Sequence, residues 1–221
     1  MDIHEVINKF EDAFEDGVSE ELHSFIDTLN IKIFRVNYFI DQFLVEKSNY
    51  ENETDSNKLN DATWINESFE KIGANAASAL YHLHSLADVL GQVINETVLN
   101  RHFTDIGDVS ITSIANALKQ KVNGGDVSLQ AVFTKVRNLT SSQSWYYTNA
   151  FVNSEKHRLL IQYSDQRNLG QRNMVPTFNE FNFKNRNYPQ TQIEPKLDQC
   201  KSKIIDDLNR VLDEIFTIYG V

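Results

Sequence analysis

The segment 152–158, with the sequence VNSEKHR, contains the side chains that are best suited to chemistry in this chain. Asn153 and His157 are four residues apart, so on a helix they lie on the same face. An amide and an imidazole, flanked by the cations of Lys156 and Arg158, can bind a phosphate group or a base edge. The alternative interpretation is structural, because basic side chains in a last helical turn stabilise the helix through its dipole.

The spacing of Asn153 and His157 resembles a motif of the HEPN superfamily of helical bundles. Ribonucleases of that superfamily carry Arg, then a polar residue that is often Asn, then three residues and His. The resemblance covers this motif and a helical layout over roughly residues 63–158. It implies a site in which His157 acts on a 2′-hydroxyl beside Asn153. Val152 stands where the family has its Arg, and valine cannot stabilise the charge of a phosphate, so the resemblance implies a catalytically lapsed member.

A second pair of chemical interest, His84 and Asp88, lies one helical turn apart in the segment 81–88. This spacing suits two ligands of one metal ion, but a third ligand would have to come from elsewhere in the chain. A hydrogen-bonded pair, in which the carboxylate fixes the imidazole tautomer, explains the same spacing. We favour the hydrogen-bonded pair, and we expect no metal and no cofactor.

Other catalytic signatures are absent from the sequence. The chain contains one cysteine, Cys200, in a segment that we interpret as a helix surface. Glycine-rich phosphate loops, the Gly-x-Ser-x-Gly elbow and Cys-x-x-Cys pairs do not occur, so the common nucleotide-binding and hydrolase folds have no support.

Charge and aromatic residues are unevenly distributed along the chain. Residues 1–70 contain 17 acidic and 5 basic side chains, a net charge of −12, whereas residues 156–186 contain six basic and two acidic ones, a net charge of +4. Arg167 belongs to this basic segment, and Lys156, Arg158 and Arg167 are the predicted binding cations. Aromatic residues gather around the same segment, where they either stack bases or pack a core, and we favour packing. The aromatic residues are Trp145, Tyr146, Tyr147, Phe151, Tyr163, Phe178, Phe181, Phe183 and Tyr188.

The composition predicts a folded chain of 221 residues with long helices. Hydrophobic residues make up 41%, and only three prolines and eight glycines occur, which argues against disordered linkers and against a turn-rich β-sandwich. We found no secretory leader and no run of about 18 apolar residues. We therefore expect a cytoplasmic protein with no association with a membrane.

Apolar residues at spacings of three and four predict most of the elements. We expect helices over about 3–14, 19–43, 63–99, 110–122, 126–139, 141–157 and 204–219, with an exposed loop over 48–61. The small residues of 73–79 predict a close crossing of two helices. Residues 159–163 and 177–183 alternate like strands and are predicted to pair.

The fold class that we predict is therefore mainly α. It is a bundle of about six or seven helices with a short β-hairpin, at about 159–183, inserted before the C-terminal helix. We found no internal repeat and no boundary, so we expect a single domain over 1–221.

Two functions agree with these observations. The first is a non-enzymatic binding or regulatory domain that recognises a protein or RNA near His157, and a homodimer is compatible with it. The second is a metal-independent ribonuclease of a defence or toxin system that uses His157 with Asn153 and an Arg from outside the motif. Valine at position 152 favours the first.

Overall fold

A computed structural model describes residues 6, 9–10, 19–157, 161–165 and 173–220 of the chain. The chain divides into two compact units. Unit 1 contains the described residues of 1–33, 83–146 and 202–221, and unit 2 contains those of 34–82 and 147–201. Helices α2, α4, α7 and α8 each have residues in both units.

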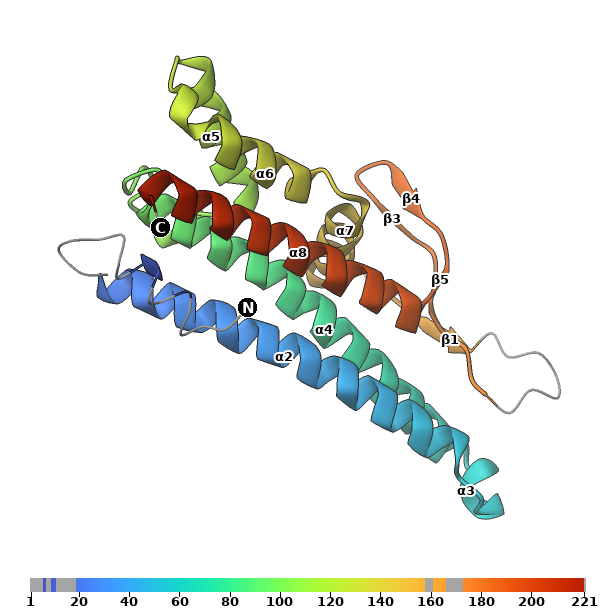
Figure 1. Ribbon diagram of the computed structural model, residues 1–221. Helices are drawn as coiled ribbons and strands as arrows, with labels where there is room; N and C mark the ends of the chain where they lie inside the picture. Colours follow the sequence, from blue (N-terminus) through green and yellow to red (C-terminus); the bar gives the residue numbers. More distant parts are fainter. Residues whose placement is uncertain (1–5, 7–8, 11–18, 158–160, 166–172, 221) are drawn as a thin grey trace. The chain divides into compact units, whose positions relative to one another are not determined.

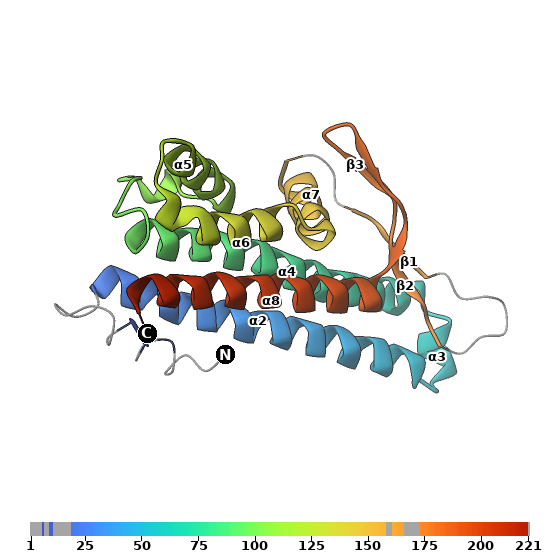
Figure 2. The same cartoon turned by 45° about the horizontal axis from the view of Figure 1, so that its top comes forward.

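The described residues form seven α-helices, two short 3-10 helices and five short strands (Figures 1 and 2). The predicted mainly α class, with a small β region before the C-terminal helix, is confirmed. The α-helices are α2 (Glu20–Glu51), α3 (Ser56–Leu59), α4 (Ala62–Glu96), α5 (Ile111–Asn123), α6 (Gln130–Thr140), α7 (Gln143–His157) and α8 (Ile193–Tyr219). The single-domain organisation stays a prediction.

Unit 1 is built from helices whose apolar faces meet in a shared core. Its fully buried side chains come from α2 (Ile26), α4 (Leu86, Leu90, Ile94), α5 (Ile114, Leu118), α6 (Val132, Val136) and α8 (Ile215). Helices α5 and α6 lie side by side, joined by the 3-10 helix η2 (Val127–Leu129) (Figure 2). The other 3-10 helix, η1 (Ile106–Asp108), lies in the connection from α4 to α5.

Unit 2 combines helical segments with two small antiparallel sheets. One sheet has the order β1 (Tyr163–Asp165), β2 (Pro176–Phe178) and β5 (Thr191–Gln192), and the other pairs β3 (Phe181–Phe183) with β4 (Arg186–Tyr188). In the first sheet Tyr163 lies opposite Phe178. The two predicted strand segments do pair, but residues 177–183 do not form one strand, because residues 179–180 separate β2 from β3. The strands also continue beyond residue 183 to residue 192.

Tertiary packing changes two features that local patterns predicted. The loop predicted over 48–61 begins after residue 51, because α2 extends to Glu51. Tyr50 in this last turn is buried and stacks on Trp64 of α4, with ring centroids 5.4 Å apart. The small residue Gly73 faces the ring of Tyr163 in β1, where a β-carbon would collide with the ring. Gly73 therefore makes room for a strand, and the close helix crossing at residues 73–79 stays a prediction for the rest of this stretch.

The predicted helix over 3–14 lies mostly outside the described residues. Val6 and Phe10 are described as helical and buried, and the Phe10 ring packs against Phe216 of α8 with centroids 4.8 Å apart. No helix in the described part of the chain combines the length and the apolar character needed to cross a membrane.

Candidate functional site

Helix α7 contains most of the motif at residues 152–158. The first two residues of the motif, Val152 and Asn153, differ in how deeply they are buried. Val152 has none of its surface exposed and belongs to the core of unit 2. Asn153, the next residue, is half-buried. The position that corresponds to the arginine of the HEPN motif is therefore a core position, and its side chain is a packing element.

The amide of Asn153 is engaged by its own helix. Its Nδ2 atom donates to the backbone oxygen of Asn149 at 2.8 Å and to the Asn149 Oδ1 atom at 2.9 Å. Asn149 lies one turn earlier in α7, so this pair forms a polar strip along the helix. Binding of a ligand by the Asn153 amide nitrogen would require exchange of these two hydrogen bonds.

The cations predicted from the sequence are only partly described. Lys156 is exposed, and its Nζ atom lies 5.8 Å from the centroid of the Tyr81 ring, a cation-π distance. The backbone of His157 ends α7, but its side chain lies outside the described residues, as do Arg158 and Arg167. Lys156 therefore lies in the same unit as Asn153. The positions of the His157, Arg158 and Arg167 side chains stay predictions.

Glu155 lies in the same region, and no sequence pattern singled it out. It is half-buried, and its Oε1 atom accepts a hydrogen bond from the backbone nitrogen of Ile161 at 2.6 Å. Burial raises the pKa of the Glu155 carboxyl, and the hydrogen bond from Ile161 opposes that shift. Glu155 thus connects α7 to the backbone at Ile161 by a hydrogen bond. The half-buried carboxylate loses part of its hydration in this position.

Two phenols complete the group around Glu155. Burial, followed by the charge of Glu155, raises the pKa of Tyr81. The same two causes, in the same order, raise the pKa of Tyr163 in β1, where Glu70 and Tyr81 add smaller effects. The end of α7 therefore presents one exposed lysine beside a half-buried carboxyl and two phenols that keep their protons.

This composition suits hydrogen bonding and selective binding better than phosphate chemistry. A carboxylate repels a phosphate, and a phenol whose pKa is raised is a hydrogen-bond donor that does not act as a base at neutral pH. The group joins α7 and the following strand β1 to α4, which is distant from both in the sequence. The only sequence signal for it was that Tyr81 and Glu155 each lie within a segment already of interest.

His84 and Asp88 form a pair in unit 1, and both side chains also contact residues of neighbouring helices. The Nδ1 atom of His84 lies 3.4 Å from Asp88 Oδ2, and the imidazole stacks on Trp145 with centroids 5.2 Å apart. Asp88 Oδ1 also accepts from the backbone nitrogen of Ile111 at 3.2 Å, at the start of α5. Among the residues with described side chains, no three His, Cys, Asp or Glu groups gather in a way that could hold a metal ion.

Several aromatic residues near the basic segment, and the cysteine, lie in the core of unit 2. The Phe151 ring packs against Phe178 and Phe181, with centroids 4.7 and 6.0 Å apart, and Phe181 stacks on Tyr188 at 4.9 Å. Phe151 and Phe178 have no exposed surface, so they cannot stack on bases. Cys200 is also fully buried, so its predicted place on a helix surface is wrong.

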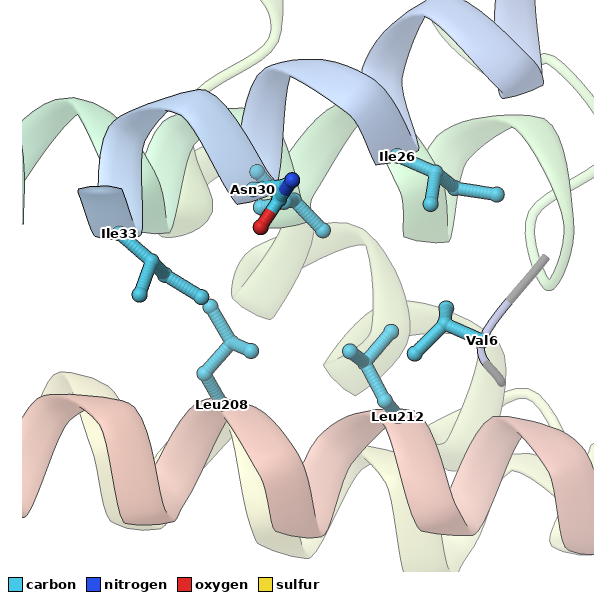
Figure 3. A pocket seen from close by; sticks show the side chains of 7 residues that line it. Val6, Ile26, Asn30, Ile33, Leu208 and Leu212 are labelled. Atoms are coloured by element: carbon cyan, nitrogen blue, oxygen red, sulfur yellow. The ribbon is translucent and has the colours of Figure 1, made fainter. Parts of the chain in front are cut away.

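One apolar cavity of unit 1 lies between α2 and α8 (Figure 3). Its volume is about 20 Å³, and it is partly open to solvent. The lining residues are Val6, Ile26, Leu29, Asn30, Ile33, Leu208 and Leu212. Because none of these side chains is charged or titratable, the cavity offers no catalytic group.

Comparisons of the chain with protein-family models, with curated proteins and with solved structures find no match.

Proposed function

We propose that this chain is a non-enzymatic binding domain whose partner contacts unit 2 at the C-terminal end of α7. The observation that carries the proposal is the complete burial of Val152, at the position where a HEPN-like ribonuclease would need an exposed cation. A core valine excludes the charge that such catalysis requires at this position. The engaged amide of Asn153 and the carboxyl of Glu155 give further support.

Binding at this site would rest on a few cations. Lys156 is held at the surface over the Tyr81 ring, and Arg158 and Arg167 follow in the basic segment. The whole chain has a net charge of −10, so its long-range field repels nucleic acid and only a local cationic surface can favour it. A protein and single-stranded RNA are the two partners that the sequence predicts, and RNA binding tests whether these few cations outweigh the charge of the whole chain.

Cleavage of RNA tests the non-enzymatic part of the proposal. Purified protein and its His157→Ala variant are incubated with a labelled single-stranded RNA, and the products are separated on a denaturing gel. We expect the RNA to remain intact with both proteins. Cleavage by the native chain that disappears in His157→Ala would contradict the proposal and favour the ribonuclease.

Salt-dependent binding tests the RNA part. Anisotropy of the labelled RNA is followed between about 50 and 200 mM salt, where each phosphate contact contributes to the slope. We expect binding that weakens when Lys156, Arg158 and Arg167 are replaced by alanine. The matched control replaces Lys119, Lys121 and Arg137 of α5 and α6, which changes the net charge equally. Equal losses in both variants, or no RNA binding, would remove RNA as the partner.

A further inference from the structure

Helix α2 has apolar residues on two opposite faces. Val36, Ile40 and Phe43 are buried on one face, at exposures of 0, 7 and 0%. On the other face Phe34, Tyr38 and Val45 are 67, 46 and 48% exposed. The core of unit 2 therefore uses only one face, and the second face needs another explanation.

The exposed face has the spacing of a coiled-coil seam. Phe34, Tyr38, Asp41 and Val45, here named the α2 stripe, follow one another at intervals of four, three and four residues. All four are exposed, and the rings of Phe34 and Tyr38 stack with centroids 6.5 Å apart. A seam with this spacing fits a second helix packed along it.

The order of residues in the α2 stripe makes it complementary to itself. The two alternating positions of such a seam are called a and d. Tyr38 and Val45 are a positions, and Phe34 and Asp41 are d positions. In an antiparallel pair of helices, each a position packs against a d position of the partner. With Phe34 opposite Val45 of a second copy, Tyr38 falls opposite Asp41. An apolar pair then flanks the two central layers on each side, and in each central layer the Tyr38 phenol can donate to the Asp41 carboxylate.

We infer that the α2 stripe binds a second copy of this chain in an antiparallel helix pair. Asp41 in the middle of an apolar seam would be costly against a purely apolar partner, because its carboxylate would lose water without gaining a donor. The second copy supplies that donor from Tyr38, and a twofold axis makes both contacts at once. The inference does not depend on the binding role proposed for the end of α7.

The mass of the protein in solution tests the inference. One seam of four residues buries less than a standard interface, so we expect association in the micromolar range or weaker. Sedimentation equilibrium from about 1 to 500 µM should show the mass rising from 25.5 kDa towards twice that value. A constant mass of one chain over this range would overturn the inference.

Single substitutions connect the association to the stripe. We expect Val45→Asp and Phe34→Asp to weaken dimerisation at least about tenfold, because each places a charge in an apolar layer. The matched control is Leu59→Asp, which adds the same charge at an exposed leucine of α3, outside the stripe. Circular dichroism checks that all three variants fold. A dimer that survives both stripe substitutions, or that is weakened equally by the control, would overturn the inference.

Cross-linking reads the direction of the two helices. Phe34→Cys and Val45→Cys are made separately and then mixed under mild oxidation, with the buried Cys200 retained. The antiparallel register predicts that the mixture forms disulfide-linked dimers, whereas either variant alone forms few. Efficient linkage of each variant with itself would show a parallel pair and overturn the proposed register.

Discussion

At the scale of single residues, Gly73 is a position where one added methyl group should destabilise the protein. Its place against the Tyr163 ring leaves no room for a β-carbon. Gly73→Ala should gain up to about 1 kcal/mol of helix propensity but lose about 1–3 kcal/mol to overpacking. We expect a net destabilisation of about 1–2 kcal/mol, measured by urea unfolding.

A double-mutant cycle assigns that loss to one contact. Tyr163→Ala removes the ring, so Gly73→Ala should cost much less in that background than in the native chain. If the cost is the same in both backgrounds, the collision with Tyr163 is not its cause.

Glu155 makes stability depend on pH. Because its folded pKa is raised, the unfolded chain releases this proton first as the pH rises above the ordinary glutamate value of about 4.3. Stability from this group therefore falls as the pH passes from that value to the raised folded pKa, and is constant above it. Glu155→Gln removes the titration, while its amide oxygen can still accept from Ile161.

The comparison of these two proteins isolates the effect. Free energies of unfolding are measured in urea between about pH 4 and pH 8. Relative to Glu155→Gln, the native chain should lose stability as the pH rises through this window. The matched control is Glu67→Gln, at an exposed position of α4. A difference that is independent of pH would show that burial of Glu155 does not perturb its ionisation.

Residues of the candidate site were predictable only where one element holds them. The spacing of Asn153 and Lys156 placed both on one helix, and the structure agrees. The link from Glu155 to Tyr81 and Tyr163 joins three segments, so no local pattern contains it. Burial of Cys200 was missed for the same reason, because its polar sequence neighbours say nothing about the helix face that α8 buries.

At the scale of elements, apolar periodicity predicted helices well and predicted their ends less well. Helix α4 was expected over about 63–99 and spans Ala62–Glu96, because its apolar face is continuous. Helix α2 continues past its last predicted turn, because Tyr50 packs against Trp64 and Phe69 of α4. Such ends are set by contacts distant in sequence, which periodicity does not contain.

The start of α5 shows a local signal that can be tested. Ser110 accepts from the Ser113 backbone nitrogen at 3.1 Å, and the Ser113 hydroxyl accepts from the Ser110 nitrogen at 2.8 Å, which forms a capping box. Ser110→Ala should therefore destabilise the protein by about 1 kcal/mol in urea unfolding.

A serine near the next helix provides the control for this cap. Ser128, before α6, is exposed, and its hydroxyl donates to the Asp126 carboxylate at 2.6 Å. Ser128→Ala should change stability by less than about 0.5 kcal/mol. Equal losses at Ser110 and Ser128 would mean that the box is not the source of the effect.

At the scale of the whole molecule, helices that the two units share should couple the unfolding of one unit to that of the other. Helices α2, α4, α7 and α8 have residues in both units, so unfolding one unit breaks helices that the other unit needs. A helix interrupted in its middle loses cooperativity, because each new end leaves backbone groups without partners. We therefore expect the units to unfold in one transition, as a single domain does.

The two tryptophans of the chain allow each unit to be followed separately. Trp145 is 4% exposed in unit 1, and Trp64 stacks on Tyr50 in unit 2. Trp64→Phe leaves only the probe in unit 1, and Trp145→Phe leaves only the probe in unit 2. Within each variant, the fluorescence midpoint in urea should coincide with the midpoint from circular dichroism. Comparison within one variant removes the effect of the substitution on stability, so separate midpoints would show two domains that share helices but unfold independently.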